Sequence, residues 1–179
     1  FVDIAGNGIM VGEIENNRLI EGELWWKESP EQASAENKIT NNLIEKCGQV
    51  YFGAVGVWMG LSSNNLVAHN LIRDLPYSGV SSGWLWSTKK SPCKGNVVEY
   101  NHVYNVLELL NDGGAFYFLG RQDGALCRGN LIHDISECEF SPHPLNNAIR
   151  WDRGGAGVLV EYNFVYNIQN PLMQFNRES

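Results

Sequence analysis

The chain has 179 residues, of which 44% are hydrophobic and 18% charged, and its formal net charge is −7 at pH 7. This composition predicts a folded globular domain and argues against a disordered chain. The negative charge, with no run of basic residues longer than Lys89 and Lys90, argues against a nucleic-acid partner. No apolar run approaches the ~18 residues of a membrane-spanning helix, so a membrane partner is not expected either.

A short pattern, Asn followed by two mostly apolar residues, returns five times along the chain. Its asparagines are Asn42, Asn70, Asn101, Asn130 and Asn163. Four residues after each of them the chain carries Lys46, Asp74, Asn105, Asp134 and Asn167, of which all but the lysine are typical turn residues. The repeat therefore predicts a stack of similar coils, each turning at the same place.

Each repeat contains three β-prone segments. The first lies at 56–60, 116–120 and 149–153, ten residues before the Asn, and residues 8–12 resemble an earlier copy. The second lies at 66–67, 97–98, 126–127 and 159–160, and the third includes the apolar residues after the Asn. This alignment places Asp152 in a column with Met59 and Leu119, and Arg150 in a column with Val57 and Tyr117.

Three short strands per repeat cannot bury a hydrophobic face singly, but stacked coils bury it continuously. The sequence therefore predicts an all-β, right-handed parallel β-helix of five to six coils, forming one domain over residues 1–179. The repeated Asn is expected to form a hydrogen-bonded ladder inside the stack. Neither end resembles a polar cap, so we expect the solenoid to be capped by the rest of a longer chain or by another subunit.

The four cysteines are Cys47, Cys93, Cys127 and Cys138, and none lies in a CxxC pair or at zinc-ligand spacing with a histidine. Buried free thiols are favoured over disulfides. We expect no metal site and no cofactor.

Three insertions, at 22–36, 81–95 and 136–147, are expected to be loops that border a groove along one long face of the solenoid. They carry Trp25, Trp26, Trp84 and Trp86, and a Trp face suits the apolar side of a sugar ring. Trp58 and Trp151 lie within strand segments and are expected to fill the core.

Charged residues that break the repeat mark candidate chemistry. Asp152 and Arg150 stand where other coils carry apolar residues, and they form either a structural ion pair or part of a site. Asp112 precedes two glycines at the entrance to the same strand one coil earlier, as a catalytic group or as an ordinary turn residue. Two carboxyl groups on adjacent coils suit glycosidic cleavage.

Other polar residues are alternatives or helpers. Glu137, Glu139 and His143 in the third insertion are candidates to replace or assist Asp112. His102 and His133 are expected to be hydrogen-bonded scaffold, with His133 also a candidate to line a sugar site.

Four strings resemble the right-handed β-helix glycoside hydrolases of the pectin-lyase-like superfamily, especially family 141 and more distantly family 120. They are NLIRDLPYSGVSSGW at 70–84, NDGGAFY at 111–117, NLIHD at 130–134 and IRWD at 149–152. The resemblance spans nearly the whole chain and implies two catalytic carboxylates, which map to Asp112 and Asp152. Family 120 places its acid further on, where this chain has Gln174 and Asn176, and this departure favours family 141.

The first hypothesis is a secreted, periplasmic or cell-surface hydrolase of a plant or microbial oligosaccharide or polysaccharide. Asp112 and Asp152 are its carboxylate pair, and Trp84, Trp86, Tyr117, Arg150 and His133 bind the sugar. A neutral glycan is favoured, because an acidic face repels uronates.

Two alternatives remain open. One is a non-catalytic glycan-binding or structural solenoid of the tailspike or adhesin kind. The other is a calcium-dependent polysaccharide lyase, although the Asp clusters of pectate-type lyases and the Gly-His-Gly of polygalacturonases are absent.

Overall fold

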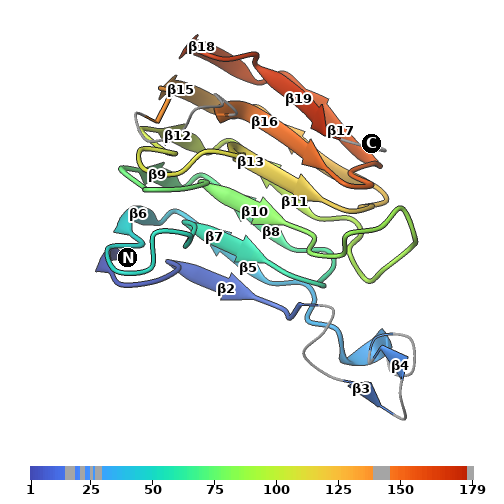
Figure 1. Cartoon of the computed structure of the whole chain (residues 1–179). Helices are drawn as coiled ribbons and strands as arrows, with labels where there is room; N and C mark the ends of the chain where they lie inside the picture. Colours follow the sequence, from blue (N-terminus) through green and yellow to red (C-terminus); the bar gives the residue numbers. More distant parts are fainter. Residues whose placement is uncertain (15–18, 21–22, 25, 27–29, 139–145, 177–179) are drawn as a thin grey trace.

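The computed structural model describes residues 1–14, 19–20, 23–24, 26, 30–138 and 146–176. The elements with described bounds are β-strands and one short 3-10 helix, η1 (Pro30–Gln32). The strands stack into three parallel sheets that run the length of the molecule (Figure 1).

The strands divide among the sheets as follows. The first sheet contains β2 (Ile9–Val11), β7 (Val57–Met59), β10 (Val80–Ser82), β13 (Gly113–Leu119), β16 (Asn146–Asp152) and β19 (Met173–Asn176). The second contains β5 (Lys38–Thr40), β8 (Leu66–Ala68), β11 (Val97–Glu99), β14 (Ala125–Arg128) and β17 (Val158–Glu161). The third contains β1 (Val2–Ile4), β6 (Leu43–Cys47), β9 (Leu71–Arg73), β12 (His102–Tyr104), β15 (Leu131–Ile135) and β18 (Phe164–Ile168). A separate antiparallel pair is formed by β3 (Leu19–Ile20) and β4 (Glu23–Leu24).

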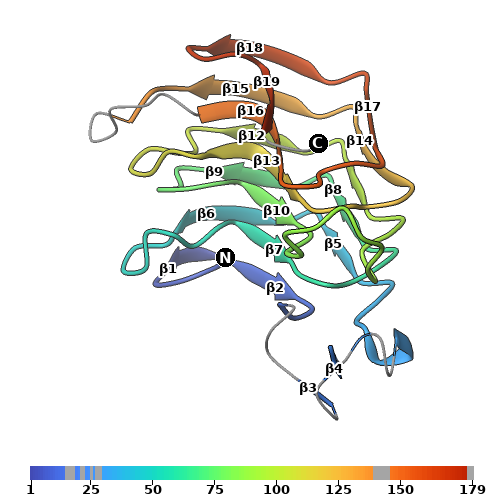
Figure 2. The ribbon, with the colours of Figure 1, turned by 45° about the vertical axis from the view of Figure 1, so that its right-hand side comes forward.

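The chain passes from the first sheet to the second and third, and then returns to the first sheet one level along (Figure 2). Each strand therefore pairs with the corresponding strands of the coils before and after it. This arrangement is a parallel β-helix, as the repeat predicted.

Apolar columns fill the interior of the coils. In the third sheet, Ile44, Ile72, Val103, Ile132 and Val165 are in register, and the first four are fully buried. Val67, Val98 and Cys127 form the matching column of the second sheet. Every coil thus adds one layer to a continuous core, and the pattern of second and third strands is confirmed.

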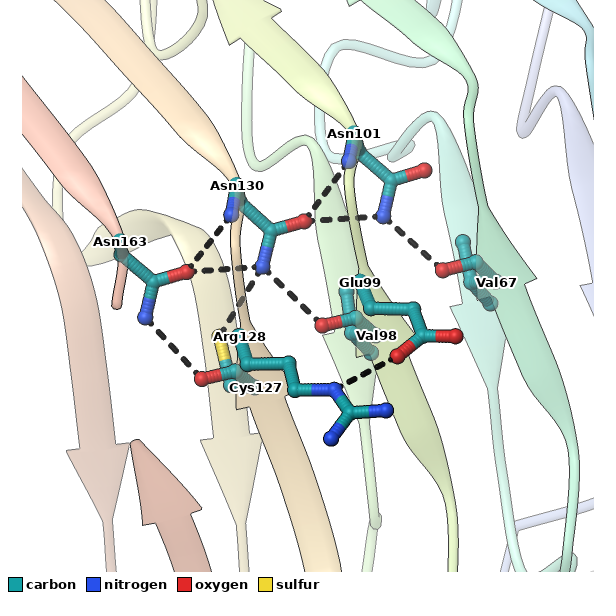
Figure 3. A network of polar contacts seen from close by, with 8 residues as sticks. All are labelled: Val67, Val98, Glu99, Asn101, Cys127, Arg128, Asn130 and Asn163. Atoms are coloured by element: carbon teal, nitrogen blue, oxygen red, sulfur yellow. Dashed lines mark hydrogen bonds and ion pairs between the residues drawn. The ribbon is translucent and has the colours of Figure 1, made fainter. Parts of the chain in front are cut away.

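The repeated asparagines form the predicted ladder (Figure 3). The side-chain amide of Asn101 donates to Asn130 Oδ1 at 3.1 Å and to the carbonyl of Val67 at 2.9 Å. Asn130 repeats both contacts one coil later, with Asn163 and Val98. The amides thereby tie neighbouring coils together and satisfy carbonyl groups of the second sheet.

A second ladder was not predicted from the sequence. Asn37 donates to Asn65, and Asn65 donates to Asn96, each at 2.9 Å between side-chain atoms. Asn96 donates in turn to the carbonyl of Ser62 at 3.0 Å. This ladder lies at the corner between the first and second sheets, where neighbouring loops differ in length and obscure the repeat.

The predicted turn residues adopt the left-handed backbone conformation. Lys46, Asp74, Asn105, Asp134 and Asn167 have φ values of 52°, 54°, 49°, 54° and 52°. Asn and Asp tolerate this region better than most residues, which explains their recurrence at this corner.

The alignment of the first sheet needs one correction. Residues 116–120 and 149–153 share columns as predicted, but residues 56–60 are displaced by one. Arg150 and Tyr117 are therefore in register with Trp58, and not with Val57. Met59 lies in the inward column of Trp151, and not in that of Asp152. A shift of one residue exchanges the two faces of a strand.

The loop predicted at 81–95 also starts later in the structure than the sequence suggested. Ser81 and Ser82 belong to β10, which pairs with β7 on one side and β13 on the other. The long connection to the second sheet follows this strand, so the first sheet is continuous across the coil.

The four cysteines are buried free thiols, as favoured from the sequence. Burial raises the pKa of Cys127 to about 12. Among the described residues there is no helix long and apolar enough to cross a bilayer.

Candidate active site

The outward face of the first sheet carries an unusual column. Trp58, Ser81, Tyr117, Arg150 and Gln174 follow one another across β7, β10, β13, β16 and β19. Although Arg150 points away from the core of the helix, only 1% of it is exposed. A buried guanidinium needs partners of opposite charge or strong acceptors, so its surroundings define the site.

Asp112 is one such partner. Its carboxylate forms an ion pair with the Arg150 guanidinium, while the Asp112 side chain remains 59% exposed. Asp112 stands immediately before β13 with a φ of 65°, a conformation that Asp tolerates. The turn therefore presents an accessible carboxylate beside a buried cation.

The side chain of Tyr77 supports this turn, since its hydroxyl donates to the Asp112 carbonyl at 3.0 Å. The glycines after Asp112 do not open space for a ligand. A Cβ on Gly113 would lie 2.6 Å from Leu107 and 2.9 Å from the Tyr77 ring. Gly113 thus lets this turn pack tightly against the protein itself.

Asp152 lies at the end of β16, on the same outward face. Its carboxylate accepts hydrogen bonds from the Tyr117 hydroxyl at 2.6 Å and from the Asn176 amide at 2.9 Å. The backbone N–H of Arg153 adds a third at 2.9 Å. An ionised carboxyl group is purely an acceptor, so three convergent donors suit the carboxylate form.

The two carboxylates belong to one electrostatic neighbourhood. Burial, followed by the charge of Asp112, raises the pKa of Tyr77 to about 12, and the charges of Arg150 and Asp152 also act on it. Burial and the hydrogen bond to Asp152 raise the pKa of Tyr117 well above its usual range. Both phenols therefore stay protonated and serve as hydrogen-bond donors at neutral pH.

Amides complete the cluster. The Arg150 guanidinium donates to Gln174 Oε1 at 3.3 Å, and Asn176 contacts Asp152 as described. Gln174 and Asn176 therefore lie beside Arg150 and Asp152, respectively.

Trp84 and Trp86 lie beside this column at the side of the earlier coils, next to its member Trp58. Trp84 donates from Nε1 to Ser81 Oγ at 3.1 Å, and its ring lies 5.6 Å from Trp58 and 5.4 Å from Trp86. Trp58 is 6% exposed and Trp86 is 45% exposed. Trp58 thus faces outward beneath Trp84 instead of filling the core, whereas Trp151 does belong to the core.

The structure brings together six of the seven predicted site residues on one face. Asp112, Asp152, Tyr117 and Arg150 contact one another in pairs, and Trp84 and Trp86 continue from the neighbouring strand. His133 lies apart, on the third sheet, where its ring stacks between Tyr104 and Tyr166.

Of the suggested helpers, Glu137 donates its backbone N–H to Gln169 and has no described contact with the cluster. Glu139, His143 and Trp25 lie outside the described residues. Tyr77 and Ser81 belong to the cluster but were not predicted. The sequence signal was the Pro-Tyr-Ser-Gly turn leading into β10, a strand that the alignment missed.

A comparison with solved structures agrees with this architecture. The chain is similar to a solved protein named "Glycoside hydrolase". The match has a TM-score of 0.74 and 23% sequence identity, and it covers 98% of this chain and 31% of that one. At this identity the likeness shows a shared fold, and this chain spans about a third of the other protein's length. No protein-family model and no curated protein matches the sequence.

Proposed function

We propose that this protein is a glycoside hydrolase in which Asp112 and Asp152 are the catalytic carboxyl groups. The observation that carries the proposal is that both carboxylates are held by two side chains that are neighbours on adjacent strands. Arg150 binds Asp112, and Tyr117, which is in register with Arg150, binds Asp152. The fold shared with a solved glycoside hydrolase supports it.

The reaction needs two roles. One carboxyl group donates a proton to the glycosidic oxygen as the C–O bond breaks, and the other attacks the anomeric carbon or removes a proton from the attacking water. Asp152, held by three donors, suits the second role because its charge is preorganised. Asp112 is the exposed member and is assigned to the leaving oxygen, a role that requires it to leave its ion pair with Arg150 and take up a proton when the substrate binds.

The exposed aromatic residues are the proposed sugar-binding surface. Trp86, exposed and braced edge-on by Trp84, offers a face to the apolar side of a sugar ring. A neutral sugar is the favoured substrate, because a uronate would meet two carboxylates and an arginine that is already paired.

The test is hydrolysis of a panel of neutral polysaccharides and 4-nitrophenyl glycosides by the whole chain. Asp112→Asn and Asp152→Asn are each expected to lower kcat by at least ~100-fold on any active substrate, since each removes a required proton-transfer or nucleophilic group. Glu99→Gln is the matched control, because Glu99 also pairs with an arginine, Arg128 at 2.8 Å, on the second sheet.

Unchanged kcat in both Asp variants would refute the assignment of the carboxyl pair. Glycan binding without turnover by the wild-type chain would support a binding module instead. Products that absorb in the ultraviolet, formed in a chelator-sensitive reaction, would identify a lyase.

A further inference from the structure

A second cluster of chemistry-bearing side chains lies on the outward face of the third sheet. His102 in β12 and His133 in β15 approach each other with their Nε2 atoms 2.7 Å apart. His102 is in register with Leu131, and His133 with Tyr104, so the two imidazoles are diagonal neighbours on adjacent strands. This face is distinct from the first sheet, which carries the candidate active site.

The His133 ring is held on three sides. Its Nδ1 lies 2.8 Å from Asp134 Oδ2, and its faces stack against Tyr104 at 4.8 Å and Tyr166 at 4.7 Å between centroids. Asp134 is itself fixed by a hydrogen bond from Asn167. A proton on Nδ1 directed at Asp134 leaves the lone pair of neutral His133 on Nε2, facing His102.

The contact between His133 and Asp134 resembles the carboxylate contacts of metal-binding histidines in other proteins. Metal-binding histidines commonly donate their second ring N–H to a carboxylate, which fixes the tautomer and the ring orientation. Two imidazole nitrogens at about 2.0–2.1 Å from one ion, at adjacent corners of a square, stand about 2.9 Å apart. The observed separation of 2.7 Å is close to that value, and the two rings, whose centroids lie 4.9 Å apart, would turn from facing each other toward a common ion.

We propose that His102 and His133 form a two-imidazole binding site for a divalent transition-metal ion, with Asp134 as the positioning residue. Nitrogen ligands at adjacent corners favour Cu²⁺ and then Ni²⁺. Among the described residues no group of three or more His, Cys, Asp or Glu side chains converges, so water would fill the remaining positions. Binding requires that the proton of neutral His102 move from Nε2 to Nδ1 and that the two rings turn toward the ion.

Neighbouring charges are compatible with this site. Burial, and then the charge of a protonated His133, lower the pKa of His102. Arg73, in register with Tyr104, is a cation on the same sheet. Its guanidinium is engaged by Glu45 and by the Tyr104 hydroxyl, at 3.2 Å from the latter.

Cu²⁺ itself is the probe, titrated at pH 7 in a buffer that does not bind metals and followed by calorimetry and electron paramagnetic resonance. We expect one Cu²⁺ per chain with the nitrogen hyperfine pattern of two imidazoles. His102→Gln and His133→Gln are each expected to weaken binding by at least ~10-fold, and Asp134→Asn by ~10-fold or more. His69→Gln is the matched control, since His69 stacks on Tyr100 at 5.3 Å, away from the pair.

Folding is checked by circular dichroism and thermal melting without metal. If His133→Gln does not fold, His102→Gln is the decisive variant, because His102 is not part of the Tyr104–His133–Tyr166 stack. Wild-type affinity in a folded His102→Gln variant would overturn the proposal, as would loss of binding in His69→Gln.

Discussion

Replacing Asn101 with Ala removes the middle rung of the asparagine ladder. Its side chain takes part in four hydrogen bonds: Oδ1 accepts from the backbone and side-chain nitrogens of Asn70, and Nδ2 donates to Val67 and Asn130. Asn42, at the start of the ladder, provides the comparison. Its side chain makes two described hydrogen bonds, to Thr40 and Asn70, and is only partly buried.

The expected magnitudes follow from these contacts. A typical intramolecular hydrogen bond contributes about 1 kcal/mol net, and a buried group left unpaired costs about 1–3 kcal/mol. Asn101→Ala loses all four bonds and leaves the buried Asn70 backbone N–H without its acceptor, so we expect a loss of about 4–5 kcal/mol. Asn42→Ala is expected to cost about 1–2 kcal/mol.

The assay is urea unfolding at pH 7, followed by tryptophan fluorescence and circular dichroism. The difference of about 3 kcal/mol between the two variants is the informative quantity, because both replacements remove the same atoms. If Asn101→Ala proves no more destabilising than Asn42→Ala, the ladder does not stabilise the stack in the way described.

Three further predictions concern other parts of the chain. Cys127, whose pKa is raised to about 12 by burial, and Cys93, raised by burial as well, are expected to react with Ellman's reagent only after unfolding; rapid reaction in the native state would contradict their burial. The pKa of His102 is lowered from 6.5 in the folded chain, so the unfolded chain binds a proton on His102 more tightly than the folded chain does. The free energy of unfolding should therefore fall as the pH drops below 6.5 toward the pKa of His102 in the folded chain. His102→Gln should reduce this pH dependence of the free energy of unfolding, measured by urea titration between pH 5 and 7.5. An unchanged slope would show that other groups cause the pH dependence. Trp86→Ala is expected to raise KM roughly 3- to 10-fold with little change in melting temperature, because the ring is 45% exposed; an unchanged KM would remove Trp86 from the sugar site.

The fold was predictable because its determinants recur in the sequence. An inward amide and a left-handed corner impose the same residue types on every coil, so Asn70, Asn101 and Asn130 mark the period directly. The second ladder, through Asn65, was harder to find because it follows corners of unequal length.

The register of the first sheet was only partly predictable. The first strand of each coil was aligned by counting residues back from the ladder asparagine, which assumes that this stretch has the same length in every coil. The stretch that follows Met59 is one residue shorter than those that follow Phe118 and Trp151. Backbone pairing, and not residue count, fixes which side chains face outward. Trp58 was expected in the core because it lies within a strand segment, but this register turns it outward.

The candidate site shows the same limits. Asp152 was singled out because it shares a column with Leu119, and Asp112 because it precedes two glycines at the entrance to a strand. Their link through Arg150 and Tyr117 depends on β13 and β16 being adjacent in register, which no local pattern encodes. Tyr77 comes from the preceding coil and joins the cluster only through three-dimensional stacking.

The register that unites Tyr117 and Arg150 also restricts how such a site can be altered. Outward side chains on a parallel sheet occupy a lattice, with steps of about 4.8 Å between coils and about 6.6 Å between alternate residues of one strand. A carboxylate moved from Asp152 can only take another lattice point, such as that of Gln174 or Ser81. Redesign of this face for a longer or shorter spacing between functional groups is therefore a choice among discrete positions.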